Sequence, residues 1–325
     1  MKKFKLKASN VKTSAEFNEL YKKLYASNIY NLEKTRKKVR ILTIIQYILI
    51  VFFIIACGIL DADFDVFNYE ISRNLVIIGA ISFIILIPVL IKNYKIKSNY
   101  KNTYKNEILS NFFNLINNKL TYKPECLEEG IKLQNIYKTV EFDKKKYNKW
   151  EVDDYIEGYL DEDTFAKLCD IHLQYESGSG DDKTVTEIFQ GIFAITSCNK
   201  DIGTYVKISK DKFKLKAKPD LVQLDNQTFE KYFDVYSEDK IFALRILTPD
   251  IMELLMDFYT KYELDFEIVF KNENIYLRFF TGAMFEPRIF GNSMDRELLV
   301  LYSSILKFVL ELTKEVNHVL KDIEV

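Results

Sequence analysis

The stretch ILTIIQYILIVFFIIACGIL, residues 41–60, decides the fold because it contains no charged side chain. At about 1.5 Å of rise per residue, a helix of this length crosses a bilayer core of roughly 30 Å. A second uncharged run, LVIIGAISFIILIPVLI at residues 75–91, is close to the lower length limit of about 17 residues for a transmembrane helix. Core helices of soluble proteins rarely run this long without a polar stripe, so the sequence predicts a transmembrane helical hairpin.

Basic side chains flank this hairpin on the sides away from its short connection, residues 61–74. They are Lys34, Arg36, Lys37, Lys38 and Arg40 before the first run, and Lys92, Lys95 and Lys97 after the second run. Because Lys and Arg near span ends are retained on the cytoplasmic side, we expect a two-pass protein of the cell membrane with both termini in the cytoplasm. The acidic connection would then lie outside. The same basic side chains could bind anionic headgroups of the lipid bilayer, or could serve topology alone.

Small residues occur at a similar depth in the two runs. They are Ala56, Cys57 and Gly58 in the first run, and Gly79, Ala80 and Ser82 in the second. Small side chains let two helix backbones approach closely inside a bilayer, where no hydrophobic effect draws them together. We therefore expect the two spans to touch there, and large residues at Gly58 or Gly79 to loosen the pair.

Charge is unevenly distributed along the chain. The formal net charge is -1, but residues 1–40 contain 12 Lys and Arg against 3 Glu, so this segment carries +9 and the remainder about -10. The acidic remainder would repel phosphate, and a nucleic acid is not an expected partner. The 4 cysteines and 2 histidines lack zinc-site spacing, so we expect reduced thiols and no metal or cofactor. A nucleophile and base formed by Cys169 and His172 is less favoured than a structural role for both.

Two apolar stripes beside the hairpin predict a helical stalk. The first lies on a helix expected over residues 13–40, where Thr13 and Glu16 have the spacing of a capping box. The second lies on a helix expected over residues 99–120. The stripes consist of Phe17, Leu20, Tyr21, Leu24, Tyr25 and Leu32, and of Ile108, Leu109, Phe112, Phe113, Leu115 and Ile116. We expect the two helices to pack antiparallel on each other, with self-association as a coiled coil as the competing arrangement.

The remaining chain predicts an α+β domain with a mostly antiparallel sheet and packed helices. Strands are expected at residues 165–175, 184–196, 241–247, 266–270 and 275–280, with one or two more within residues 203–216 around a turn at Lys210 and Asp211. Helices are expected at residues 227–233, capped by Asn226 or Thr228, at residues 249–262, capped by Thr248, and at residues 295–320.

These expectations divide the chain into six segments. They are a basic juxtamembrane helix at residues 1–40, spans at 41–60 and 75–91 with the outer loop 61–74 between them, a second juxtamembrane helix at 92–123 and a cytosolic α+β domain at 124–325.

Four short strings carry a resemblance to a known family. They are FQGIF at residues 189–193, FEKYFDVYSED at 229–239, LTP at 247–249 and FEP at 285–287. With the preceding pair of spans, the chain resembles the bacterial domain-of-unknown-function family numbered 3137 over roughly residues 14–320. The resemblance implies a two-span membrane protein with one cytosolic α+β domain. It implies no catalytic residues.

Candidate binding residues come from the aromatic strings and their surroundings. Phe189, Phe193 and Phe285 could line a ligand pocket, with Glu286 and Arg288 as a charge pair facing the ligand. Rings that alternate along strands are more often core, and such a charge pair is more often an ordinary surface pair. An acidic cluster could hold a divalent ion or supply acid–base chemistry, but a solvated acidic face is favoured. The cluster comprises Asp153, Asp154, Glu157, Asp161, Glu162 and Asp163.

The function that fits these observations best is a membrane-anchored interaction module. In this interpretation the hairpin holds the α+β domain at the inner membrane face, where the domain binds a protein partner or a second copy. A small-ligand sensor with an aromatic-lined pocket is the alternative. An enzyme that acts at the membrane surface through the acidic cluster is the third and least favoured hypothesis.

Overall fold

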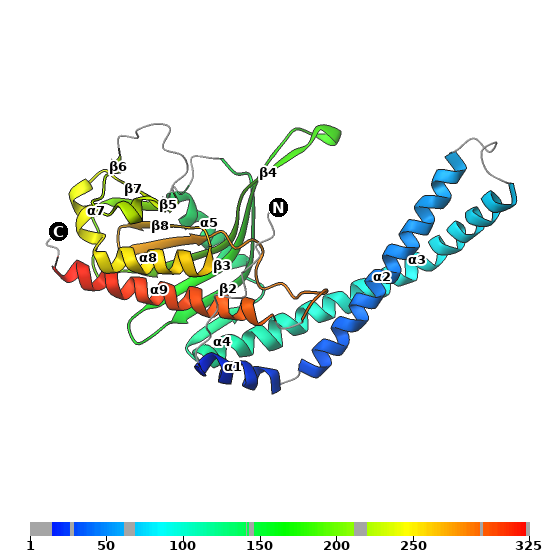
Figure 1. The fold of residues 1–325 in the computed structure, drawn as a ribbon, viewed down its shortest axis with the longest axis horizontal. Helices are drawn as coiled ribbons and strands as arrows, with labels where there is room; N and C mark the ends of the chain where they lie inside the picture. Colours follow the sequence, from blue (N-terminus) through cyan, green and yellow to red (C-terminus); the bar gives the residue numbers. More distant parts are fainter. Residues whose placement is uncertain are drawn as a thin grey trace. The chain divides into compact units, whose positions relative to one another are not determined.

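The computed structural model describes residues 15–26, 29–61, 69–140, 142, 146–210, 220–292 and 295–322. It divides the chain into two compact units (Figure 1). One, here called the sheet unit, comprises the chain up to Leu20, Leu109–Phe285 and the chain from Arg296. The other, the helix unit, comprises Tyr21–Ile108 and Glu286–Asp295. The predicted α+β class with an apolar helical hairpin is confirmed.

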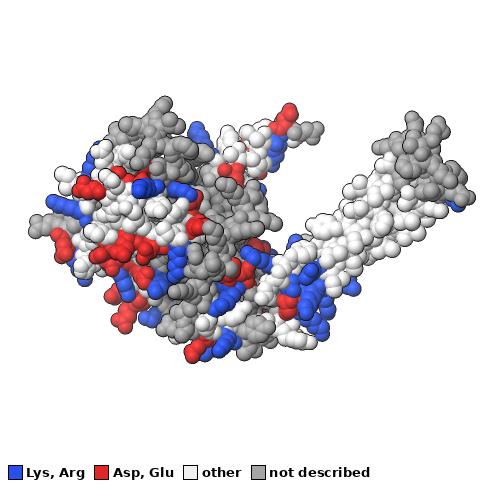
Figure 2. All heavy atoms as spheres, in the orientation of Figure 1, with Lys and Arg blue, Asp and Glu red and all other residues white. Residues whose placement is uncertain are grey.

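The helix unit is built on α2 (Ile29–Asp61) and α3 (Tyr69–Thr103), which pack along each other and are both long and apolar enough to cross a membrane. Their apolar side chains point outward: Ile48, Ile54 and Ile84 are 50%, 61% and 69% exposed. An apolar surface of this kind needs a cover, which a bilayer supplies. Figure 2 shows the hairpin as a mostly uncharged shaft with basic side chains gathered at one end.

Ala56 and Gly79 bring the two helices together. Ala56 is buried, and a Cβ atom added at Gly79 would overlap the Cβ of Ala56. Phe53 and Phe83 stack nearby, with ring centroids 5.1 Å apart. The expected contact between small residues is therefore confirmed at Gly79. It is wrong at Gly58, which has no atom of the partner helix within 4 Å of an added Cβ.

The helix expected over residues 13–40 is divided into α1 (Ala15–Ala26) and the start of α2. Its capping residue Thr13 lies outside the described residues. The second predicted helix continues α3 through a π-helical turn, η3 (Tyr104–Leu109), into α4 (Ser110–Ile116).

The mutual packing expected for the two stripes stays a prediction. Phe112 and Phe113 of the second stripe belong to the sheet unit, where they contact Tyr302 and Phe285 at 6.3 and 5.9 Å between ring centroids.

The sheet unit contains a nine-stranded sheet in the order β1-β2-β3-β4-β9-β8-β5-β7-β6, with every neighbouring pair antiparallel. The strands are β1 (Leu120–Lys123), β2 (Lys149–Tyr159), β3 (Phe165–Ser177), β4 (Thr184–Ser197), β5 (Tyr205–Lys210), β6 (Leu221–Val222), β7 (Phe233–Ser237), β8 (Phe266–Lys271) and β9 (Asn274–Phe279). The helices are α5 (Leu127–Val140), α6 (Gln227–Glu230), α7 (Lys240–Ile246), α8 (Pro249–Tyr262) and α9 (Arg296–Asp322), with a 3-10 turn, η4 (Gly180–Asp182).

Alternation along β8 and β9 produces two core layers, one on each face of the sheet. Phe266 and Phe279 lie on the face covered by α9, where both contact Phe308. Glu267 and Arg278, the next residues along, lie on the opposite face with Tyr137 of α5. Helix α8 packs on α9 through Phe258, whose ring stacks on Phe308 at 4.2 Å. The sheet therefore has a separate aromatic core on each side.

Several local predictions are confirmed by specific contacts. Thr248 caps α8 by accepting a hydrogen bond from the Ile251 amide at 3.4 Å, and Asn226 caps α6. The strands expected at residues 266–270 and 275–280 are confirmed as β8 and β9, which form a hairpin with its turn at residues 272–273. The strand expected over residues 241–247 is wrong, because residues 241–246 belong to α7 and Leu247 is its C-cap. Asp239 caps that helix, accepting from the Phe242 amide at 2.9 Å. The turn at Asp211 lies outside the described residues.

Candidate functional site

The basic collar at the base of the hairpin consists mostly of exposed side chains. Lys34, Lys37, Lys38, Arg40, Lys92, Lys95 and Lys97 are exposed, as expected for residues that meet lipid headgroups. Arg36 differs from them, because its side chain is only 5% exposed. Its Nε donates to Glu33 at 2.9 Å, and this pairing raises the pKa of Arg36. The structure therefore gives Arg36 a role within the protein.

The segment Glu286–Asp295 belongs to the helix unit and is called here the β9–α9 loop. The Glu286 carboxylate lies 2.7 Å from Lys101 Nζ and 3.1 Å from Lys105 Nζ. Arg288 forms an ion pair with Asp295. Glu286 and Arg288, the charged candidates for ligand binding, are thus each engaged with another residue of the helix unit.

Backbone carbonyls also fix this loop. Tyr100 donates its hydroxyl to the Arg288 carbonyl at 2.9 Å, and Arg36 donates to the Ile289 carbonyl at 2.9 Å. Desolvation raises the pKa of Tyr100 well above its usual value, so the hydroxyl stays protonated as a donor. Both donors belong to the cytoplasmic ends expected for α3 and α2.

Phe189 and Phe193 lie together in the core layer under α5, with Arg278 between aromatic rings. Arg278 is 1% exposed, and its guanidinium carbon lies 4.8 Å from the Phe142 ring centroid and 5.3 Å from that of Phe189. It donates to Glu267 at 2.7 and 3.0 Å and to the Tyr137 hydroxyl at 2.8 Å. Cation–π contacts and a hydrogen-bonded carboxylate together stabilise a charge that would otherwise be costly to bury.

Arg278 is the buried functional group that sequence reasoning missed. One signal in the sequence could have found it. Arg278 is the only charged residue in the strand NIYLRF, and the alternation of the strand directs its side chain toward one face of the sheet. Phe193 completes the cluster by contacting Tyr137 at 5.1 Å. In this arrangement Phe189 and Phe193 fill the interior.

Phe285 lies in a separate aromatic cluster with Phe113, Tyr122 and Tyr302. Its ring centroid is 4.5 Å from that of Tyr302, whose hydroxyl accepts from the Phe285 amide at 2.9 Å. The Phe285 backbone has φ 60°, which is costly for a side chain of this size and is held by these contacts. The structure therefore does not bring the three candidate phenylalanines into one site.

The acidic cluster is mostly engaged in structural contacts. Asp154 is fully buried at a bulge of β2, with φ 53°, and accepts from the Tyr122 hydroxyl. Glu157 accepts from the Tyr155 hydroxyl at 2.8 Å and faces Lys123. The expected solvated acidic face is therefore wrong for Asp154.

Asp161 shapes the turn between β2 and β3. Its carboxylate accepts from the amides of Asp163 and Thr164, at 3.1 and 2.7 Å, and lies 2.8 Å from Lys314 Nζ of α9. Burial alone would raise the pKa of Asp161, but the hydrogen bonds from Lys314 and from the two amides outweigh it and lower the pKa.

We expect Asp161→Asn to destabilise the protein at neutral pH, and to destabilise it less as the pH falls below about 4. A carboxyl group with a lowered folded-state pKa contributes stability above its unfolded pKa of about 3.9, and loses that contribution as pH falls through the folded value. The difference in the free energy of unfolding between wild type and variant, measured by urea titration from pH 7 to pH 3, should therefore be constant down to about pH 4 and become smaller below it. Asp163→Asn, whose side chain makes no such contact in the described structure, is the control. A constant difference at all pH values would contradict this account.

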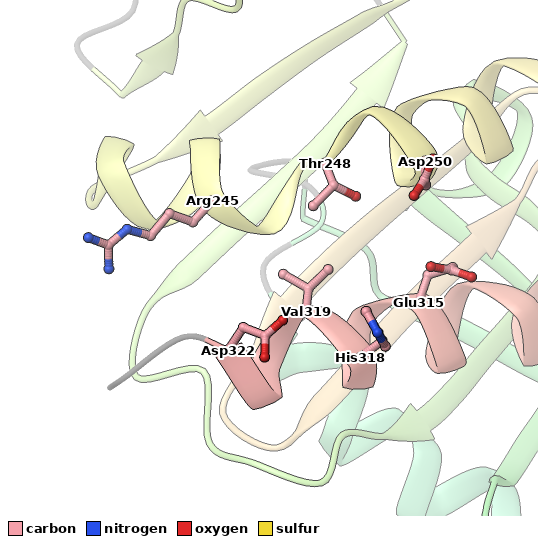
Figure 3. Close-up of a pocket in the computed structure, with 7 residues that line it drawn as sticks. All are labelled: Arg245, Thr248, Asp250, Glu315, His318, Val319 and Asp322. Atoms are coloured by element: carbon pink, nitrogen blue, oxygen red, sulfur yellow. The ribbon is translucent and has the colours of Figure 1, made fainter.

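An open depression of about 610 Å³ lies where α8 begins and α9 ends (Figure 3). Its lining consists of Arg245, Thr248, Asp250, Glu315, His318, Val319 and Asp322. Glu315, His318 and Asp322 share a face of α9, while Figure 3 shows the Arg245 side chain pointing away from the others. None of these seven side chains has a buried polar atom without a partner, so the depression assigns no ligand by itself.

Cys169 and His172 are not arranged as a nucleophile and base. Complete burial raises the pKa of the Cys169 thiol, which keeps it protonated and unreactive. The imidazole of His172 lies 3.5 Å from both Glu151 and Glu187, on the opposite face of β3.

Comparison with protein-family models matches residues 187–318 to the family described as protein of unknown function (DUF3137). All four motifs that carry the resemblance lie within this range, so the resemblance is confirmed there. No curated protein matches the chain. Among solved structures, the mycobacterial trehalose monomycolate transport factor A, TtfA, is similar at 9% identity and a TM-score of 0.35, over 69% of this chain and 94% of that chain. A similarity at this level carries no argument about function.

Proposed function

We propose that the protein is a membrane-anchored interaction module. The hairpin of α2 and α3 spans the bilayer, both termini lie in the cytoplasm, and the sheet unit binds a protein partner there. The outward apolar side chains of the hairpin and its exposed basic collar support the anchor and its orientation.

Partner binding is argued from an edge of β4 that pairs with no strand in the described part of the chain. Strand β4 pairs with β9 only from Ile192 to Ser197, whereas it pairs with β3 from Thr184 onward. In the part of the chain that the structure describes, residues 184–189 therefore have a strand neighbour on one side only. Figure 1 shows this end of β3 and β4, here called the arm, projecting from the sheet.

The arm offers the chemistry that an extended peptide recognises. An unpaired edge presents backbone donors and acceptors to which a partner strand can hydrogen-bond, and adjacent side chains supply specificity. Val185 and Tyr175 are 48% and 41% exposed on the arm. The carboxylate of Glu176 holds Lys183 at 2.9 Å, so charge lies beside the apolar side chains at the tip.

The test is site-specific photo-crosslinking in native membranes. A photoreactive amino acid at Val185 of the full-length protein should crosslink to a discrete partner, identified by mass spectrometry. The same amino acid at Lys307, 72% exposed on α9, is the control and should not crosslink to that partner. The same products from both positions, or none from Val185, would contradict binding at the arm. A product that contains only this chain would indicate self-association.

The small-ligand sensor is the second candidate. The residues expected to form its pocket are engaged elsewhere, which makes it the weaker of the two. Phe189 and Phe193 are packed in the core, Phe285 lies in another cluster, and Glu286 and Arg288 are in ion pairs. A ligand at 100 times its dissociation constant would add about 2.7 kcal/mol of stability, which a thermal-shift screen of the full-length protein would detect. The surface-enzyme hypothesis is weaker, because Asp154, Glu157 and Asp161 are bound by structural partners.

A further inference from the structure

The β9–α9 loop runs along α2 and α3 toward the ends of their uncharged runs. Its residues meet helix positions that lie progressively closer to the uncharged runs. Glu286 pairs with Lys105, 14 residues beyond the end of the second run, and the Arg288 carbonyl accepts from Tyr100, 9 residues beyond it. The Ile289 carbonyl then accepts from Arg36, 5 residues before the first run.

Phe290 contacts the helix position that is closest to an uncharged run. Its ring centroid is 5.9 Å from the guanidinium carbon of Arg40, the residue that immediately precedes the uncharged run of α2. At about 1.5 Å of rise per residue, Arg40 stands roughly 6 Å nearer to the bilayer core than Arg36. The chain then turns at Gly291, where φ is 120°. Phe290 therefore lies at the level where the first span would enter the bilayer.

The Phe290 side chain is 55% exposed although it is large and apolar. The loop is held by the carbonyls of Arg288 and Ile289, so the Phe290 ring is left to face outward. Phe and Leu side chains that are accompanied by Lys and Arg insert at the boundary between headgroups and acyl chains. The neighbouring exposed residues Lys37, Lys38 and Arg40 carry the charge that complements anionic headgroups.

We propose that the β9–α9 loop is a third membrane contact, with Phe290 inserted among the headgroups of an anionic bilayer. This inference rests on the proposed anchor, because it needs the hairpin to be in the membrane. It adds that a segment from the C-terminal half of the chain touches lipid. The loop joins β9 to α9, so the lipid surface would contact a connection between two core elements of the sheet unit.

The test uses a fluorescent probe whose emission is quenched by spin-labelled lipids. The full-length Cys57→Ser protein carries Phe290→Cys labelled with a nitrobenzoxadiazole, because Cys57 is the one exposed cysteine of the four. The protein is reconstituted in phosphatidylcholine–phosphatidylglycerol vesicles that contain lipids spin-labelled near the headgroup or near the chain end. Ile84→Cys in the second span and Asn102→Cys, exposed on α3 beyond the collar, are the reference positions.

We expect the label at position 290 to lose more emission to the shallow quencher than to the deep one. The label at position 84 should lose more to the deep quencher, and the label at 102 should lose little to either. Quenching at 84 without quenching at 290 would overturn this inference and leave the anchor intact. A blue-shifted emission at 290 that lipid does not quench would assign Phe290 to a protein contact instead. No quenching at either position would overturn both proposals.

Discussion

Replacing Arg278 by alanine should lower the free energy of unfolding of the sheet unit by about 3–5 kcal/mol. The guanidinium is 1% exposed and pairs with Glu267, which is itself 4% exposed. Without Arg278 the Glu267 carboxylate stays buried, with Lys207 at 3.5 Å as a cationic neighbour. The variant would also lose the contacts with the rings of Phe142, Phe189 and Phe280. We therefore expect one of the largest effects of any single substitution in this unit.

Urea unfolding followed by tryptophan fluorescence measures this loss directly. The chain has 1 tryptophan, and its ring contacts Tyr137 of the same cluster at 5.4 Å between centroids. Lys307→Ala removes an exposed ion pair with Glu311 and should change stability by no more than about 0.5 kcal/mol. The double variant Arg278→Met, Glu267→Leu should recover much of the stability, since apolar residues of similar volume can replace a buried pair. A loss below about 1 kcal/mol in Arg278→Ala would show that the pair is not essential to this core.

The hairpin and the long strands were predictable because their patterns are long. An uncharged run of the length of residues 41–60 has few alternatives in folded proteins, and the alternation of apolar and polar side chains over residues 171–175 of β3 favours a strand. Short apolar runs are different. Residues 241–247 have the composition of a strand. Asp239 nevertheless caps α7, and this helix buries Phe242 and Ile246. Tertiary packing decides whether such a segment forms a helix or a strand, and the local sequence pattern carries no information about that packing.

The candidate site could be predicted less well, for a physical reason. Rings that alternate along a strand look the same whether they fill a core or line a pocket, and only the packing around Arg278 decides the matter for Phe189 and Phe193. The partners of Glu286 are Lys101 and Lys105, more than 180 residues away along the chain. No local spacing encodes such pairs. The stripe at Phe112 and Phe113 is buried as its amphipathic pattern predicts, but that pattern does not name the ring partners Tyr302 and Phe285.

Replacing Gly79 by leucine should separate the two spans near Ala56, at a cost of about 1–3 kcal/mol in helix packing. An added Cβ would overlap the Ala56 side chain and would lie 3.5 Å from the Ala56 Cα. Both helices are closely packed there, since Ala56 is 5% exposed. The rest of a leucine side chain has no room unless one helix moves, so the backbones have to part or rotate.

Gly58→Leu is the matched control, because the same substitution there meets no atom within 4 Å of its Cβ. The readout is disulfide formation between Phe53→Cys and Phe83→Cys in Cys57→Ser protein in native membranes, since those rings stack at 5.1 Å. We expect Gly79→Leu to slow disulfide formation and Gly58→Leu to leave it near the parent rate. Equal slowing by both would attribute the effect to a general disturbance of the helices. Equal rates in all three proteins would mean that the approach at Gly79 does not hold the hairpin together, and that its packing resides in other pairs such as Asn93 with Gln46, 2.9 Å apart.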